Sequence, residues 1–262
     1  MEKGDRGSAL KKIRVEVLNM VRAAGEGHVP SAFSVIEILY ALYSRMGERD
    51  RFFLSKGHAS TALYATLAHF GALNERELQT YGKYNSALGG HPHRNEKKGI
   101  MNSSGSLGHG FPVAAGYALS LRLKRGGGRV FCLVGDGECN EGTIWETALL
   151  ASHLKLRELV CVVDNNGSQT RAVPSGDLAE KFRSFGWNAV EVKNGHRVND
   201  LENAIFAERG DDERPYCVVA HTKKGKGVRE MEENHFAWHH RAPTPEEYER
   251  FVKEIMGSPE EA

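Results

Sequence analysis

The sequence predicts an α/β fold with a mostly parallel central sheet flanked by helices. Residues 129–134 (RVFCLV) and 158–164 (ELVCVVD) are near-continuous apolar runs, typical of parallel strands buried on both faces. A helical pattern over residues 141–154 joins them and makes a strand–helix–strand unit, for which a right-handed crossover is expected. Further short strands are expected at 188–192 and 216–220. This alternation of strands and helices indicates three layers with the sheet in the middle.

Helices are expected before the first of these strands. Residues 8–24 place apolar side chains on one helical face. Ser34 and Glu37 match a capping box, which predicts that a second helix begins at Ser34. Residues 59–70 predict a third helix, which Gly71 ends.

The remaining helices follow from the same signals. They are expected at 111–125, near 177–185, near 199–208, and from a capping box formed by Thr244 and Glu247. The polar segment 222–243 has no periodicity, and loops of that length in a compact domain are usually functional or disordered.

Composition excludes several classes of protein. The 262 residues include 35 Lys+Arg and 34 Asp+Glu, so the net charge of +1 gives no electrostatic case for a nucleic-acid or polybasic membrane protein. The 40% hydrophobic content argues against intrinsic disorder, and no apolar run approaches the ~20 residues of a membrane span. The four cysteines lack metal-type spacing, and no signal-peptide core opens the chain. One cytoplasmic domain covering residues 1–262 is the expectation.

Two strand ends carry oxygen ligands. Strand 129–134 runs into Gly-Asp-Gly, and strand 158–164 runs into Asn-Asn, with 27 residues (138–164) between the two motifs. Ligands of a doubly wound sheet bind beyond the carboxyl ends of the strands. Asp136 and Asn166 offer the hard oxygen atoms that Mg²⁺ or Ca²⁺ prefers.

The surrounding residues suit a diphosphate. Gly135 and Gly137 allow close approach of the backbone to a ligand. A helix beginning near Glu141 would point its N-terminus at an anion. Two alternatives remain. One is a degraded dinucleotide-binding fingerprint, but its third glycine is missing and Asp136 would face a pyrophosphate with no metal to neutralise it. The other is an ordinary strand–turn–helix corner.

The motifs together resemble the transketolase family of thiamine-diphosphate enzymes. Besides the Gly-Asp-Gly and Asn-Asn motifs, the motifs are FFLSKGHAS (52–60), GGHPHR (89–94), SSGSLGHG (103–110) and WHH (238–240). They occur in family order and cover nearly the whole chain. The resemblance is to the N-terminal, diphosphate-binding domain, as encoded separately in organisms with a split enzyme. It implies the three-layer thiamine-diphosphate-binding fold.

The resemblance implies roles for particular residues. The metal, Mg²⁺ or Ca²⁺, would be held by Asp136, Asn166 and the main-chain carbonyl of Ser168. Residues expected around thiamine diphosphate are Ser31, His58, Gly105, Ser106, Leu107, Gly137, Asn166, Lys224 and His239. The expected catalytic residues are His28 and His91 near the reacting carbonyl, His239, and Glu141 as an acidic link between cofactor sites across a subunit interface.

The other histidines have plainer interpretations. His69, His153 and His196 lie in helix or turn patterns and are interpreted as structural. His93, His221, His235 and His240 remain undecided.

The resemblance also implies a reaction and a partner. The reaction is transfer of a two-carbon ketol unit from a ketose phosphate to an aldose phosphate. The family requires a glutamate from a pyrimidine-binding domain, and no such domain fits before Ala262, so we expect half an enzyme. Its partner would be a C-terminal transketolase subunit in an α2β2 assembly, with sugar phosphates as substrates and no nucleic acid or membrane.

Departures from the family pattern leave the substrate open. They are Pro30, His109, Ser168 and His240. Two other functions also stay open: the α subunit of a 2-oxo-acid dehydrogenase, and a non-catalytic cofactor-binding module.

Overall fold

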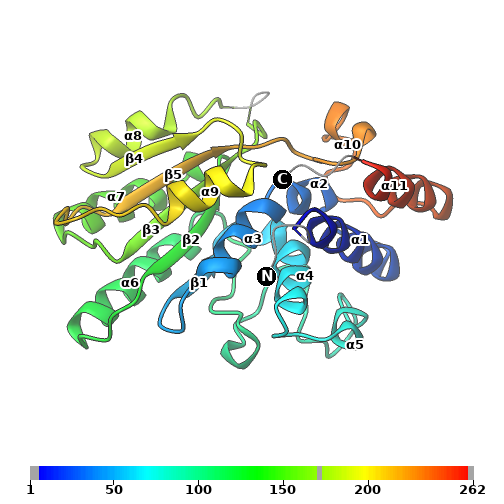
Figure 1. The fold of residues 1–262 in the computed structure, drawn as a ribbon, viewed down its shortest axis with the longest axis horizontal. Helices are drawn as coiled ribbons and strands as arrows, with labels where there is room; N and C mark the ends of the chain where they lie inside the picture. Colours follow the sequence, from blue (N-terminus) through cyan, green and yellow to red (C-terminus); the bar gives the residue numbers. More distant parts are fainter. Residues whose placement is uncertain (1–5, 170–172, 259–262) are drawn as a thin grey trace.

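A computed structural model describes residues 6–169 and 173–258. Its centre is a five-stranded parallel sheet with the strand order β1-β2-β3-β5-β4 (Figure 1). The strands are β1 (Arg51–Leu54), β2 (Val130–Gly135), β3 (Leu159–Asn165), β4 (Asn188–Val192) and β5 (Tyr216–His221). Because all pairs are parallel, every carboxyl end lies at the same edge.

The sheet is covered on both faces, as the apolar runs predict. Alternate residues of β2 enter different apolar clusters: Phe131 and Leu133 pack with α1, α3 and α4, whereas Val130, Cys132 and Val134 pack with α6 and α7. Every residue of β2 is buried. The three-layer α/β fold is therefore confirmed, and the layers can be followed in Figure 1.

The helices fall into groups around the sheet. One face carries α6 (Gly110–Leu123), α7 (Gly142–His153) and α8 (Leu178–Ser184), and the other carries α3 (Ile36–Arg45) and α9 (Val198–Ile205). Further helices are α1 (Arg6–Ala24), α2 (Val29–Phe33), α4 (Ser60–His69), α5 (Glu75–Leu78), α10 (Arg229–Glu233) and α11 (Pro245–Gly257). Of these, α1, α4, α5 and α11 lie together at one side of the molecule in Figure 1.

The expectation at Ser34 is wrong. No helix begins there, because α2 ends at Phe33 and α3 starts at Ile36 without a side-chain cap. The Ser34 hydroxyl instead donates to a buried carboxylate, Asp164, at 2.7 Å. Tertiary partners have taken the polar atoms that a capping box would have used.

Several short elements were not expected from the sequence, including α2, β1 and α10. β1 has only four residues and immediately precedes the SKGHAS motif, and α10 interrupts the segment 222–243. The cap at Thr244 is confirmed, since its hydroxyl accepts from the Glu247 amide at 3.2 Å. Within the described ranges, no helix has the length and apolar character needed to cross a membrane.

Candidate cofactor site

Four strands deliver their motifs to one edge of the sheet. The register places Gly135 of β2 opposite Asp164 of β3, so the two motifs that follow these strands are neighbours. β1 leads into Lys56, and β5 leads into the segment that carries Lys224. Parallel topology thus assembles residues that are far apart in the sequence.

These segments enclose a cavity of about 330 Å³. It is lined by Ser31, Lys56, His58, Leu107, Gly135, Asp136, Gly137, Glu138, Asn166, Ser168, Gln169, Lys224, Phe236 and His239. All three expected metal ligands are in this set, together with most of the expected cofactor contacts.

Ser168 joins the two expected metal ligands. Its hydroxyl donates to Asp136 Oδ1 at 2.5 Å, and its amide donates to Asn166 Oδ1 at 3.0 Å. Asp136 also accepts from the Gly137 amide at 2.8 Å. A carboxylate and an amide oxygen therefore converge at the cavity wall, a donor set that suits Mg²⁺.

A fully buried carboxylate orients Asn166. The amide nitrogen of Asn166 donates to Asp164 at 2.9 Å, and Asp164 also accepts from Ser34, Thr222 and the Lys56 ammonium. Because the side-chain nitrogen of Asn166 is hydrogen-bonded to Asp164, the side-chain oxygen of Asn166 faces away from Asp164. Sequence reasoning missed Lys56 and Asp164, although Asp164 directly precedes the Asn-Asn motif and Lys56 directly precedes the Gly-His pair.

Lys224 is a buried cation beside this donor set. Only 5% of its surface is exposed, and no carboxylate in the described parts of the chain forms an ion pair with it. Burial, followed by the nearby Lys56 charge, lowers the pKa of Lys224 to about 8. A buried ammonium in this setting is suited to an anionic ligand such as a diphosphate.

The Lys224 segment is fixed by a second buried network. The Lys223 amide donates to His196 Nε2 at 2.8 Å, and His196 Nδ1 lies 3.0 Å from Glu37. Glu37 also pairs with Arg14, whose Nε donates to the Lys226 carbonyl at 3.1 Å. Charge pairing with Arg14 and the His196 hydrogen bond outweigh burial and lower the pKa of Glu37 to about 2. The structural interpretation of His196 agrees with these contacts.

Five histidines form a cluster beside the cavity, and two of them, His58 and His239, line it. The ring of His28 lies 4.6 Å from His58, 5.3 Å from His239 and 4.4 Å from His240, and His91 lies 5.3 Å from His58, all between ring centroids. The expected sugar-binding histidines are therefore brought together. His240, which was undecided, belongs to the same cluster.

Burial disfavours the charged form of His28, His58, His91 and His239. Burial is the main cause that lowers the pKa of His28 to about 3 and of His58 to about 4, and the neighbouring imidazoles add to the effect. Burial likewise lowers the pKa of His91 and His239. Neutral imidazoles can both donate and accept hydrogen bonds.

Glu138 connects the glycine-rich loop to the sheet. It is 1% exposed and accepts from the Ser55 hydroxyl at 2.6 Å and from the Gly108 and Gly135 amides at 2.9 Å each. Burial raises the pKa of Glu138. The sequence interpretation overlooked it, although it directly follows the Gly-Asp-Gly motif.

Five expected site residues do not line the cavity: His28 and His91 of the histidine cluster, and Gly105, Ser106 and Glu141. Gly105 has a φ of +145° and lies against the His91 ring, while Ser106 hydrogen-bonds His109 at 3.1 Å. Glu141 is exposed and precedes α7. The 3₁₀ turn Glu138–Asn140 separates the Gly-Asp-Gly motif from α7, which begins at Gly142, next to the expected start near Glu141.

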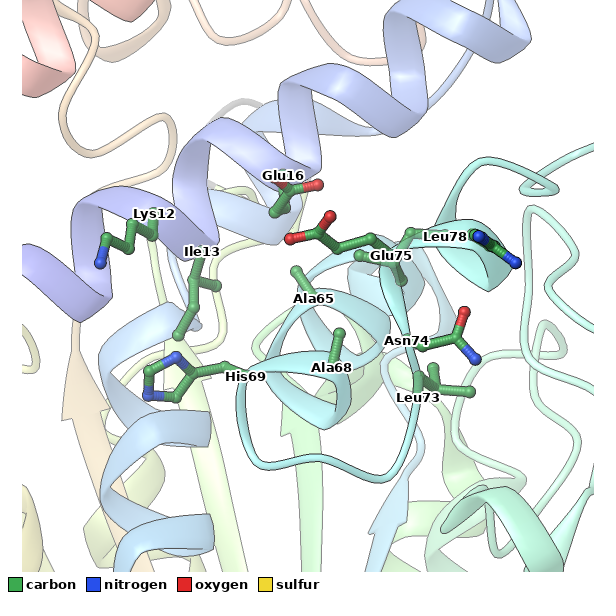
Figure 2. Close-up of a pocket in the computed structure, with 11 residues that line it drawn as sticks. Lys12, Ile13, Glu16, Ala65, Ala68, His69, Leu73, Asn74, Glu75 and Leu78 are labelled. Carbon is green, nitrogen blue, oxygen red and sulfur yellow. The ribbon is translucent and has the colours of Figure 1, made fainter.

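A separate cavity of about 710 Å³ lies between α1, α4 and α5. Figure 2 shows the Glu16 and Glu75 carboxylates at one side of it, with Lys12 and His69 on the other. None of the motif residues lines it, so the candidate site is the smaller cavity.

A family model matches almost the whole chain. Residues 6–261 match the model of the transketolase, thiamine diphosphate binding domain, and the chain belongs to this family. The resemblance seen in the motifs is thereby confirmed, and the alternatives outside the family lose their support.

Several relatives match over almost their full length. An apulose-4-phosphate transketolase subunit from Phocaeicola vulgatus is 34% identical over 260 residues, which is 94% of this chain and 92% of that protein. The 6-deoxy-6-sulfo-D-fructose transketolase subunit of a Clostridium species is 33% identical, covering 93% of each.

Longer transketolases match only over part of their length. Human transketolase is 35% identical over 93% of this chain but 41% of its own. A crystal structure of a Pichia stipitis transketolase variant has a TM-score of 0.88 at 25% identity and covers 98% of this chain and 41% of that one. The chain therefore corresponds to the N-terminal part of a transketolase, as one subunit of a divided enzyme does.

Proposed function

We propose that this chain is a single diphosphate-binding domain that binds thiamine diphosphate with Mg²⁺ and forms the N-terminal half of a split transketolase. The observation that carries the proposal is the convergence of Asp136, Ser168 and Asn166 beside the buried ammonium of Lys224. An oxygen donor set next to a buried cation fits a metal–diphosphate pair.

We assign a binding role to each group of residues in and beside the cavity. Asp136, Asn166 and the Ser168 carbonyl would bind Mg²⁺, with Ca²⁺ as the other hard cation of this chemistry. The diphosphate would be held by Lys224, His58, Ser31 and Gly137. Leu107, with Gly105 and Ser106 in the same loop, would contact the cofactor rings.

The histidines would handle the sugar. Thiamine diphosphate supplies a nucleophilic carbon and an electron sink for a two-carbon unit. His28, His91 and His239 would hydrogen-bond the hydroxyl groups of a ketose phosphate and exchange protons with the oxygen at its carbonyl. Burial lowers the pKa of all three, which favours the neutral imidazoles that can both donate and accept hydrogen bonds.

A second protein completes the proposal. The two relatives above that are matched over most of their own length are both named as transketolase subunits. We assign this chain a C-terminal partner with a pyrimidine-binding domain, in an α2β2 assembly. Glu141 would link cofactor sites across the interface between subunits. A sugar phosphate would be both donor and acceptor, and the composition argued above favours a cytoplasmic location.

Calorimetry with thiamine diphosphate tests the cofactor part of the proposal. We expect binding in the presence of Mg²⁺ and its loss in Asp136→Ala, because that change removes a charged metal ligand. Asp200→Ala, an exposed carboxylate on α9, is the matched control and should bind as the unaltered chain does. Unchanged affinity in Asp136→Ala would contradict the assignment of the site.

A further inference from the structure

The histidine cluster has a coordination chemistry that the magnesium site does not share. One ring nitrogen from each of His28, His58 and His239 lies within 4.8 Å of the other two. We infer that His28, His58 and His239 form a second metal site, selective for Zn²⁺ and similar transition metals, in the chain without its cofactor.

The geometry is close to what a tetrahedral ion requires. A point equidistant from three atoms at this spacing lies about 2.8 Å from each, against roughly 2.0–2.1 Å for a zinc–nitrogen bond. Each ring therefore has to move by less than about 1 Å. His28 precedes α2 and His58 lies in the 3₁₀ turn Gly57–Ala59, whereas His239 lies outside the helices and strands and is exposed. A small movement of His239 toward the rings of His28 and His58 would complete the metal site.

A fourth imidazole lies next to these three. The exposed His240 ring lies 4.4 Å from His28 between centroids, but His240 is not among the three histidines whose nitrogens lie within 4.8 Å of one another. Three imidazoles form a donor set that Zn²⁺, Co²⁺, Ni²⁺ and Cu²⁺ accept and that Mg²⁺ does not. The oxygen atoms of Asp136 and Asn166 show the opposite preference. The protein thus presents two neighbouring donor sets, one of nitrogen and one of oxygen atoms, that prefer different metals.

Binding at the cluster has a consequence for turnover. Zn²⁺ would occupy the imidazole of His58 that the diphosphate needs, and would inhibit transfer by competing with thiamine diphosphate for the cofactor-free chain. This consequence rests on the proposed function, but the metal site itself rests on the positions of the histidines.

Metal titration of the cofactor-free chain tests the site without any turnover. We expect one Zn²⁺ to bind per chain in the presence of excess Mg²⁺, and Co²⁺ to give the intense visible absorption of a tetrahedral complex. Sulfur bands are not expected, because all four cysteines are buried and free.

Variants locate the ion. Zn²⁺ affinity should fall at least about tenfold in His28→Ala and in His239→Ala, since each loses one of three ligands. His239 is exposed and lies outside the helices and strands, so His239→Ala is expected to fold. This variant therefore tests the site even if His28→Ala does not fold. His153→Ala, which changes a histidine at the end of α7 and far from the cluster motifs, is the control.

Three outcomes would overturn the inference. The first is an unchanged zinc affinity in His239→Ala. The second is loss of zinc binding in Asp136→Ala but not in the histidine variants, which would place the ion among the oxygen ligands. The third is complete competition by Mg²⁺. Failure of thiamine diphosphate to bind would instead count against the proposed function and leave the zinc result standing.

Discussion

Lys224 shows how a single side chain can depend on residues outside the cavity. Its ammonium faces the proposed diphosphate site, but its segment is held by Glu37 through Arg14 and His196. Glu37 does not line the cavity, so we assign it a positioning role.

A double-mutant cycle tests that role. Lys224→Met should weaken binding of Mg²⁺–thiamine diphosphate roughly tenfold to hundredfold, the cost of one lost charge-assisted hydrogen bond. Glu37→Gln should weaken it less, and the double variant should bind no worse than Lys224→Met, because both changes act on the same contact.

The control for this cycle is another buried carboxylate. Glu202 is 7% exposed and pairs with Arg6 in a contact outside the cavity. Glu202→Gln should lower stability but leave cofactor affinity unchanged. Additive losses for Glu37 and Lys224 would show that Glu37 contributes only general stability.

The histidine cluster predicts how stability depends on pH. The pKa of His28 is about 3 and that of His58 about 4 in the folded chain, against 6.5 for an ordinary histidine. The unfolded chain therefore binds more protons between these values, and stability falls as pH drops below about 6.5. Glu37, with its pKa lowered to about 2, contributes to acid destabilisation only below about 4.5.

Thermal melts of the cofactor-free chain at pH 7.5, 6.5 and 5.5 measure this effect. The melting temperature should decrease along that series, and the decrease should be smaller in His28→Asn. His153→Asn, at the end of α7, should reproduce the original slope. Equal slopes in all three proteins would contradict the assigned pKa values.

At the scale of elements, α11 holds the segment that carries His239. Phe251 of α11 packs against Trp238, with ring centroids 5.2 Å apart, and Trp238 adjoins His239 in the chain. Thr244 begins the helix with a capping box. The stability of α11 and the position of His239 are therefore linked.

Removing the cap tests this link. Thr244→Ala should lower the free energy of unfolding by about 1 kcal/mol, the usual cost of a lost N-cap, as measured by urea denaturation. Glu249→Ala changes an exposed residue of the same helix and should have a smaller effect. A stability loss in Glu249→Ala as large as that in Thr244→Ala would contradict the role of the cap.

The sequence predicted elements better than it predicted contacts between them. The strand 188–192 and the helix over 141–154 have strong periodic or apolar signals, and the structure contains both. The ion pair of Lys56 with Asp164 joins residues 108 positions apart and depends on the register of β1, β2 and β3, which no local pattern encodes. Ser34 matched a capping pattern because a local pattern cannot show a distant partner. Its hydroxyl donates to Asp164 on β3.

The metal-ligand candidates could be predicted because each belongs to a motif at the end of a predicted strand. Asp136 and Asn166 follow predicted strands, and topology alone brings them together. The clustering of His240 with His28 was not predictable, because the two residues come from opposite ends of the chain and meet only through packing of the segment after α10. Gly105 and Ser106 lie in the expected loop but outside the cavity wall.

For the whole molecule, the central claim is that this chain supplies the diphosphate site of an enzyme whose other half lies on a second protein. The chain matches relatives named as transketolase subunits over 92–93% of their length and longer transketolases over 41%. The cavity has candidate metal and diphosphate ligands within this chain. The pyrimidine-binding glutamate is assigned to the partner.

The most direct measurement is ketol transfer by the purified chain, by its C-terminal partner, and by their mixture, each with Mg²⁺ and thiamine diphosphate. Xylulose 5-phosphate and pyruvate serve as alternative donors, which separates a transketolase from a 2-oxo-acid dehydrogenase. We expect no transfer by either protein alone and transfer from the ketose phosphate by the mixture. Robust turnover by this chain alone, or a mixture that binds the cofactor and uses only pyruvate, would contradict the central claim.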